Sequence, residues 1–564
     1  MELLDLAMKK EMEKCKRIAK DAGLRFSNDT LEYIVTNRDM LELSPKLMIP
    51  TLYDYWVHDV ETVQNNWIYD IVPHNPYEAV INTRPPISYY NQDNADWFNV
   101  MIFYHVLGHI DFFQNNIFFR NTGYDDFCGQ ALADKRLINK IREDLGAEKR
   151  WVDYVIEFSR LIDNFVGYFP ELEKIDKDDS PGMFGVISPK VDFYFGKFLR
   201  ELHEAKALDL NFYYSEIDRY NRYIESAGKK NGERMFFEDN ILRGRFPEFQ
   251  ATFKQWLEKG QKPKPTDIFE YLWEHSEFLN KNENKWMKEV MQVVRRTSLY
   301  FQGQIRTKIC NEGWASLWHQ RLFIPDERIR THEVDFAKVD SRVTADPRIG
   351  INPYAVGKHL FEFIEDLARK GRLSPDYQLL KDIEARKNYD AQHGEAIGRQ
   401  ALFEARRIVD DATLINFLSE KDFQDFVDKY QFFVVGARPH PEDPDKAELY
   451  IKTKDGKRYR DLLNASLYHP PYIEYESKSH GPQLYLNHVY EGRSLVTKYI
   501  PAVLAGLSFF TGRDVRLETT EYELVQPPNR WAMMFDPDYK PEHEILRVLY
   551  VYSKQTKQIK KQIL

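Results

Sequence analysis

The apolar segment from Trp97 to Phe119 carries two histidines, His105 and His109, and it limits the possible folds more than any other stretch. Its length and nearly continuous apolar character predict a buried helix. Residues four apart lie one turn apart on the same helix face, so both imidazoles can face one small ion. An unpaired buried polar group costs about 1–3 kcal/mol, so each ring needs a partner. The pattern favours a metal-binding pair, and the alternative is a pair of hydrogen-bonded core histidines.

A candidate third ligand lies in the distant segment from Cys310 to His319. A His-x3-His helix followed by a glutamate on a later helix resembles the ligand set of the thermolysin-like zinc hydrolases. The resemblance implies one ion, zinc or another divalent metal, held by His105, His109 and Glu312. The alternative is that Glu312 is a buried carboxylate paired with an arginine such as Arg306.

The sequence departs from the thermolysin-like pattern where those enzymes carry their general base. Their glutamate directly follows the first histidine, and here that position is Val106. The inverted pattern, with glutamate just before the second histidine, is excluded because Gly108 stands there. The metal hypothesis survives this departure. An ordinary fast endopeptidase is not expected unless another residue accepts the proton.

Side chains outside the ligand set are candidates for catalytic roles. Glu78 lies on the strand-like run before the Arg84-Pro-Pro turn, which we expect to flank the histidine helix, so it is our preferred proton acceptor over Asp111 and His319. Arg84 is a candidate for stabilising an oxyanion or holding an anionic substrate. A surface salt bridge is the alternative for the Glu78 and Arg84 pair. His319 lies two turns after Glu312, roughly 10 Å along the axis, so we interpret it as facing the substrate or supporting a ligand. As a fourth ligand it would close the site and make it structural.

The chain of 564 residues is too long for one compact core and predicts at least two domains. We expect residues 1–425 to form a mainly helical body with a zincin-like helical metal site and a short strand element. Within it, we interpret residues 170–265 as an insertion and linker. The periodicity changes near residue 426, so residues 426–564 are predicted to form an α+β domain.

Three further local predictions follow from composition and capping signals. The residues Ser27 to Asp29 can cap a helix running to about Asn37. The aromatic-rich segment from Leu52 to Asp70 is expected to be helical. We interpret the basic tail from Lys554 as the solvated end of a helix.

Charge and cysteine content exclude several classes of protein. The formal net charge is −9, which gives no indication of broad binding to nucleic acid. The three cysteines are scattered without a CxxC pair, which is typical of a reducing cytoplasm. The apolar run from Tyr499 to Phe510 is too short to cross a bilayer, so we expect a cytoplasmic protein without membrane insertion.

Four motifs together resemble the SpoVR family, named after stage V sporulation protein R. They are Tyr77–Asn82, His105–Asn116, Thr307–His319 and Gly350–Tyr354. The resemblance implies a cytoplasmic protein linked to spore cortex formation in species that sporulate. Related genes often lie beside a serine protein kinase and a von Willebrand-like partner, so it also implies kinase-linked stress signalling and protein partners. The family has no settled reaction.

Two functions remain open at this point. The first is a zinc-dependent hydrolase acting on a peptide, amide or cell-wall-related bond. The second is a non-catalytic scaffold whose metal site is structural and whose C-terminal region binds a protein partner. An open coordination position beside a carboxylate favours the hydrolase, whereas a closed site favours the scaffold.

Overall fold

The computed structural model describes residues 2–36, 78–119, 122, 127–166, 189–199, 202, 210–258, 267–329, 331–344, 351–440, 443–467, 471–475, 483–525 and 543–564. The helix expected over Leu52–Asp70 lies outside these residues. The chain divides into two compact units, one formed by Met1–Val166 with Tyr271–Leu564, and the other by Gly167–Glu270. Each unit is described by itself.

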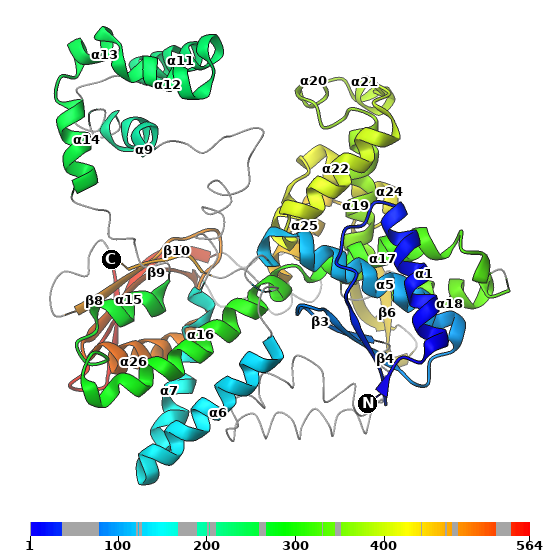
Figure 1. Ribbon diagram of the computed structural model, residues 1–564, viewed down its shortest axis with the longest axis horizontal. Coiled ribbons are helices and arrows are strands. Elements are labelled where there is room, and N and C mark those ends of the chain that lie inside the picture. The colour runs from blue at the N-terminus through cyan, green and yellow to red at the C-terminus, as the bar shows by residue number, and fades with distance from the viewer. Residues whose placement is uncertain are drawn as a thin grey trace. The chain divides into compact units, whose positions relative to one another are not determined.

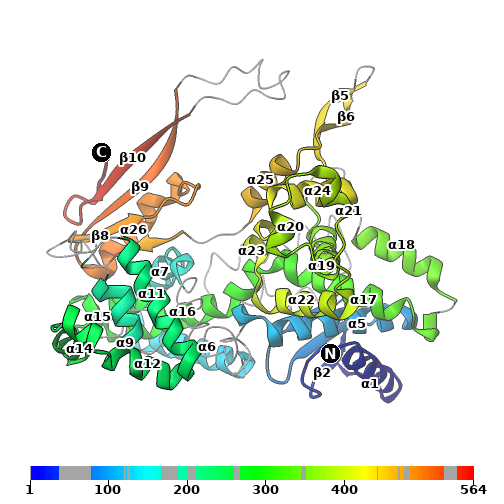
Figure 2. The same ribbon diagram turned by 90° about the horizontal axis from the view of Figure 1, so that it is seen from above.

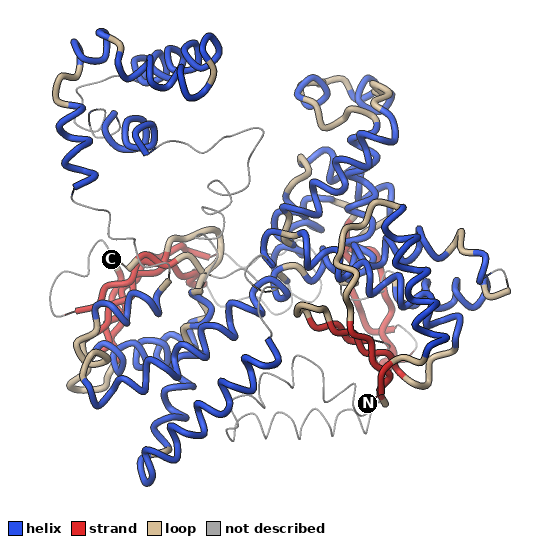
Figure 3. The backbone as a smooth tube through the Cα atoms, in the orientation of Figure 1, coloured by secondary structure: helices blue, strands red, loops and turns tan. Residues whose placement is uncertain are grey.

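Helices make up most of the larger unit, and its strands gather in three separate sheets (Figure 3). Its longer helices are α1 (Leu6–Asp21), α5 (Asp96–Asn115), α6 (Phe127–Leu145), α7 (Arg150–Arg160), α16 (Lys285–Arg306), α17 (Lys308–Phe323), α18 (Glu333–Val343), α19 (Pro353–Arg369), α22 (Gly394–Ile408), α24 (Glu420–Tyr430), α25 (Gly456–Ser466) and α26 (Ile500–Thr511). Shorter helical segments are η1 (Ile117–Phe119), η2 (Gly146–Glu148), η3 (Asp163–Phe165), η5 (Asn282–Asn284), η6 (Glu327–Ile329), α20 (Pro375–Gln378), α21 (Ile383–Asn388), α23 (Asp411–Asn416) and η7 (Thr497–Tyr499). No helix of the described ranges is long and apolar enough to cross a membrane.

Helices α5, α17 and α19 pack side by side and form the centre of the helical body (Figures 1 and 2). Every residue of α5 from Phe98 to Phe113 is buried, which confirms the predicted buried helix. Glycines allow the close packing, because a Cβ atom on Gly108 would lie 2.8 Å from the Cα atom of Ala315. Gly313 and Gly357 likewise face each other where α17 meets α19. Larger side chains at these positions would push the helices apart.

Local sequence signals fix where α17 and α19 begin. The carboxylate of Asp411 accepts hydrogen bonds from the backbone N–H groups of Ile309 and Cys310, at 3.0 and 2.8 Å, and so satisfies two free donors at the start of α17. The side chain of Asn352 accepts from the backbone N–H of Tyr354, and Pro353 occupies the first turn of α19.

A four-stranded sheet lies next to α5, with strand order β1-β2-β4-β3. Its strands are β1 (Glu2–Leu3), β2 (Leu31–Val35), β3 (Glu78–Ile81) and β4 (Ile87–Asn91). The predicted strand element is therefore present at β3, which pairs antiparallel with β4. The helix expected from Ser27 to Asn37 is wrong, because Leu31–Val35 pairs in parallel with β4. Sheet pairing overrides the capping signal there.

The C-terminal region is α+β, as predicted. The hairpin of β5 (Val434–His440) and β6 (Asp443–Thr453) precedes a five-stranded sheet in the order β11-β10-β9-β8-β7. That sheet contains β7 (Ile473–Glu474), β8 (Gln483–His488), β9 (Asp514–Leu524), β10 (His543–Tyr552) and β11 (Ile559–Ile563). The boundary placed between residues 425 and 426 falls inside α24, so the change to strands begins later than predicted. The basic tail pairs with β10 as a strand and is not a helix end.

The smaller unit has its own aromatic core. Its helical segments are α9 (Pro189–Val191), the π-helical turn η4 (Asp192–Phe198), α11 (Leu210–Ala227), α12 (Lys229–Glu238), α13 (Asn240–Arg245) and α14 (Phe249–Glu258), and α15 (Ile268–His275) crosses into the larger unit. Phe193, Tyr194, Phe236 and Phe249 are almost fully buried together. The segment we interpreted as an insertion, residues 170–265, lies inside this unit.

Candidate metal centre

The two histidines of α5 face one point in the larger unit. The His105 and His109 rings are one turn apart, with centroids 4.6 Å apart, and the two residues are only 5% and 6% exposed. Burial and the neighbouring imidazoles of His109 and His319 hold the pKa of His105 well below its usual range. A neutral imidazole is the form that binds a metal ion.

Two carboxylates approach the Nε2 atoms of these rings. An Oε2 atom of Glu312, on α17, lies 3.9 Å from Nε2 of His105 and 3.6 Å from Nε2 of His109. An Oε1 atom of Glu78, on β3, lies 3.8 Å from Nε2 of His105. Two ligands at about 2.1 Å from one tetrahedral ion are roughly 3.4 Å apart, so these separations are close to those of a ligand set. Possible ligand atoms of Glu78, His105 and His109 all lie within 4.8 Å of one another.

The other nitrogen of each ring is held by a hydrogen bond on the far side. Nδ1 of His109 lies 2.9 Å from the side-chain oxygen of Asn311, which can only accept, so Nδ1 donates. Nδ1 of His105 lies 2.9 Å from Nδ1 of His319, and Nε2 of His319 lies 3.0 Å from a carboxylate oxygen of Asp340.

This series of bonds fixes the tautomers of both rings in turn. The Asp340 carboxylate accepts a hydrogen bond from Nε2–H of His319, which leaves a lone pair on Nδ1 of that neutral ring. Nδ1–H of His105 then donates to this lone pair, and Nε2 of His105 is left unprotonated toward the carboxylates. Two unprotonated nitrogens facing two carboxylates are a set of groups suited to holding a cation. Metal-binding histidines in proteins are oriented by outer partners in this same way.

Tyr354 completes the surroundings of Glu312. Its ring stacks on His105, with centroids 6.3 Å apart, and burial together with the nearby Glu312 carboxylate raises the pKa of its hydroxyl. The cap by Asn352 places Tyr354 in the first turn of α19, which explains how the Asn-Pro-Tyr motif contributes to the site. Burial and the nearby Glu312 raise the pKa of Glu78 to about 8, so the two carboxylates do not both ionise freely without a cation.

Several predicted residues are placed apart from this cluster. Arg84 is exposed in the turn that follows β3. Glu78 is the first residue of β3, and the last residue of that strand lies roughly 10 Å further along it, before the turn. Asp111 faces away from the histidines, as expected, and accepts from the indole of Trp314 at 2.9 Å. Arg306 lies over the ring of Phe118, 5.9 Å from its centroid. Val106 is fully buried in the core.

Three contributors were not assigned a role from the sequence. Asn311 and Tyr354 lie within two of the four SpoVR-like motifs. Asn311 directly precedes Glu312 and Tyr354 directly follows Pro353, and this adjacency could have indicated a role at the site. Asp340 reaches His319 from α18 through tertiary packing. Nothing in the local pattern around Asp340 indicates that contact.

These features define a mainly helical protein in which two buried histidines and two partly buried glutamates cluster between a strand and two packed helices. The chain belongs to the SpoVR family: the family model described as SpoVR like protein matches residues 5–468, which confirms the resemblance seen in the motifs. It is similar to the uncharacterized protein YcgB of Escherichia coli (strain K12), with 23% identity over 420 residues that cover 71% of this chain and 69% of that protein. No solved structure matches the chain.

Proposed function

We propose that the cluster binds one divalent metal ion through His105, His109 and Glu312, and that the protein is a metal-dependent hydrolase with Glu78 as its proton acceptor. One observation carries the proposal. Both imidazoles have Nδ1 engaged with outer partners and turn Nε2 toward carboxylates 3.6–3.9 Å away. We assign Glu312 as the ligand because it is close to both rings and lies on a tightly packed helix.

Each residue then has a defined task. A bound zinc-type ion supplies Lewis acidity and lowers the pKa of a coordinated water to about 7. Glu78, beside His105, would serve as the general base that takes a proton from the attacking water and returns it to the leaving group. His319 and Asp340 hold the tautomer and orientation of His105. Arg84 takes no part, because the hairpin separates it from Glu78.

The proposed substrate is a peptide, amide or cell-wall-related bond. The support is chemical, since a metal site with a carboxylate base is suited to hydrolysis of such bonds. Links to spore cortex formation, kinase-associated protein partners and a cytoplasmic location all stay predictions from the family resemblance.

The second candidate is a metal-stabilised scaffold without turnover. It is favoured by the closeness of Glu78 to the histidines, because ligand atoms of Glu78, His105 and His109 all lie within 4.8 Å of one another. With Glu78 and Glu312 both bound, the ion would have four protein ligands. Closed sites of this kind are structural.

Paired isosteric variants distinguish the two candidates. Metal content and zinc affinity are measured for the wild type, Glu78→Gln, Glu312→Gln and the control Glu157→Gln, which changes an exposed residue of α7. Hydrolysis is followed with short peptides and N-acetylmuramoyl peptides. The hydrolase predicts that Glu312→Gln weakens zinc binding at least 100-fold. It also predicts that Glu78→Gln keeps one ion and loses about 10²–10⁴-fold in rate. Loss of the ion in both variants, with no turnover in the wild type, would support the scaffold.

A further inference from the structure

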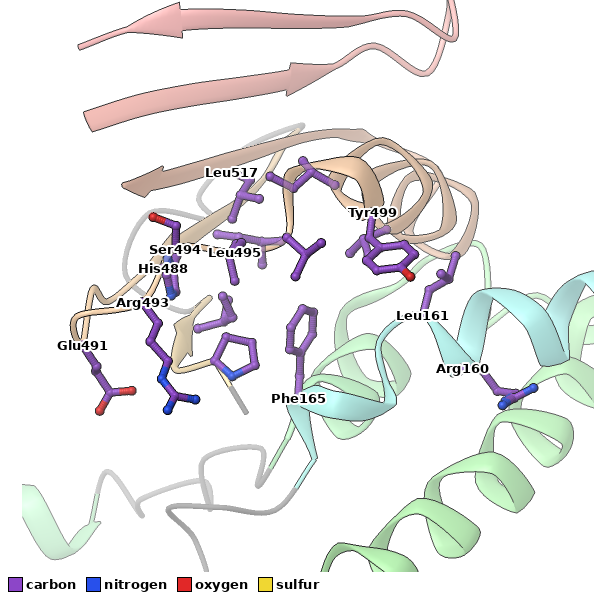
Figure 4. Close-up of a pocket in the computed structure, with 16 residues that line it drawn as sticks. Arg160, Leu161, Phe165, His488, Glu491, Arg493, Ser494, Leu495, Tyr499 and Leu517 are labelled. Atoms are coloured by element: carbon purple, nitrogen blue, oxygen red, sulfur yellow. The ribbon is translucent and has the colours of Figure 1, made fainter. Parts of the chain in front are cut away.

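A separate cavity of about 470 Å³ lies in the larger unit, between the end of α7 and the C-terminal sheet (Figure 4). Its walls come from α7, η3, β7, β8, β9 and α26 and from the loop that follows β8. The volume falls within the range of about 300–1,000 Å³ that is typical of small-molecule pockets. None of the residues of the candidate metal centre lines it.

Most of the cavity wall is aliphatic or aromatic. The apolar lining residues include Leu161, Phe165, Ile473, Leu486, Leu495, Ile500, Val503 and Leu517. Leu486, Ile500 and Leu517 are nearly fully buried, so this part of the wall belongs to the packed core of the C-terminal sheet. Such a wall suits a flexible hydrocarbon chain.

Four polar side chains gather at one end of the cavity, where His488, Glu491, Arg493 and Ser494 lie on the same side in Figure 4, and Arg160 lies on the opposite side. The hydroxyl oxygen of Ser494 is buried and has no hydrogen-bond partner among the described residues.

Two further donors belong to the same end. Arg493 uses one guanidinium nitrogen to donate to the carbonyl of Leu467 at 2.9 Å, which fixes its head and leaves other N–H groups for a ligand. His488 is buried, and its Nδ1 lies 2.8 Å from the hydroxyl of Thr519. When Nδ1 accepts from that hydroxyl, Nε2–H is a donor. Glu491 is exposed, so the negative charge is at the solvent side of this group.

We propose that this cavity binds an aliphatic carboxylic acid, with its hydrocarbon chain along the apolar wall and its carboxylate held by Arg493. The paired N–H groups of a guanidinium match the two oxygens of a carboxylate, and a charge-assisted hydrogen bond is roughly twice as strong as a neutral one. The site is distinct from the metal centre and independent of the proposed hydrolase.

Isothermal titration of the full chain with decanoate tests the proposal, with decanol and decylammonium as probes of the same chain length. Saturable binding of one decanoate is expected, with decanol at least tenfold weaker and decylammonium weaker still. Arg493→Met should weaken decanoate binding at least tenfold and leave decanol binding nearly unchanged. The matched control is Arg407→Met, an exposed arginine on α22, which should bind like the wild type.

A second variant tests the apolar wall. Val503→Phe places a larger side chain into the cavity from a half-buried position on α26, and should abolish binding of both decanoate and decanol. Thermal unfolding of each variant establishes that it is folded. Equal affinity for decanoate and decanol, or full decanoate affinity in folded Arg493→Met protein, would overturn the proposal. So would absence of saturable binding by the wild type.

Discussion

Gly108 of α5 lies directly against the backbone of Ala315 of α17, at a separation that leaves no room for a methyl group on the glycine. A Cβ atom there would lie 2.8 Å from the Cα atom of Ala315. The same two helices carry His109 and Glu312, whose Nε2 and Oε2 atoms are 3.6 Å apart. Gly108 therefore sets the distance across which these side chains can share an ion.

Gly108→Ala should lower both stability and zinc affinity. Alanine is intrinsically better than glycine in a helix by about 1 kcal/mol, but overpacking typically costs about 1–3 kcal/mol. We expect a net loss in the free energy of unfolding and at least tenfold weaker zinc binding. Calorimetry on the purified variant measures both.

The matched control for this substitution is Gly244→Ala on α13, where an added Cβ atom would meet nothing within 4 Å. That variant should be as stable as the wild type or slightly more stable, with unchanged zinc affinity. Wild-type stability and affinity in Gly108→Ala protein would show that the helix contact does not set the site.

Asp340→Ala should weaken zinc binding by about 10–100-fold, the usual effect of removing an outer partner of a ligand histidine. The Asp340 carboxylate fixes the tautomer of His319, which in turn fixes that of His105. Without the carboxylate, only a fraction of the protein has His105 in the tautomer whose Nε2 is unprotonated. One ion should still bind at high zinc concentration. Competition with a chromogenic chelator gives the affinity.

Asp335→Ala, on the same helix as Asp340 but exposed, is the control for the tautomer argument. It should bind zinc like the wild type. If the two variants lose affinity equally, the effect comes from α18 as a whole and the proposed hydrogen-bond series is wrong.

The candidate ligands on α5 could be predicted because a helix repeats every 3.6 residues, so spacing alone places His105 with His109. Glu312 followed from a resemblance to a known ligand motif. Glu78 could be suggested only as a base. The direction in which its side chain faces depends on the pairing of β3 with Ile87–Asn91 of β4.

Other parts were beyond local patterns. Leu31–Val35 follows a plausible helix cap, yet its β-branched residues pair with β4, a contact more than fifty residues away. The tail after Lys554 is rich in lysine, yet it forms the edge strand β11. It does so because the backbone N–H and C=O groups of β10 can pair with it. Asp340 depends on packing between α17 and α18, which no spacing rule specifies.

Stability should depend on pH through Asp411, which caps α17. Burial raises the pKa of its carboxyl to about 7, above its usual value of 3.8, so between these values the folded protein binds more protons than the unfolded chain. Stability from this group is therefore full below about pH 4 and is lost as the pH rises through about 7. Denaturant unfolding across pH 4–8 measures it.

Asp411→Asn is neutral at every pH and removes this dependence. The free energy of unfolding of the wild type should fall relative to the variant between pH 4 and 7 and then level off. Asp376→Asn, at an exposed position of α20, should run parallel to the wild type. A wild type that gains stability relative to Asp411→Asn over this interval would contradict the assignment.

The most direct test of the metal centre is a crystal structure of the full chain with zinc, located by its anomalous scattering. We predict one peak, about 2.0–2.2 Å from Nε2 of His105, Nε2 of His109 and a carboxylate oxygen of Glu312. Glu78 should lie within one water molecule of the ion. A peak bound elsewhere, or His105 and His109 ordered and free of metal at saturating zinc, would contradict the account.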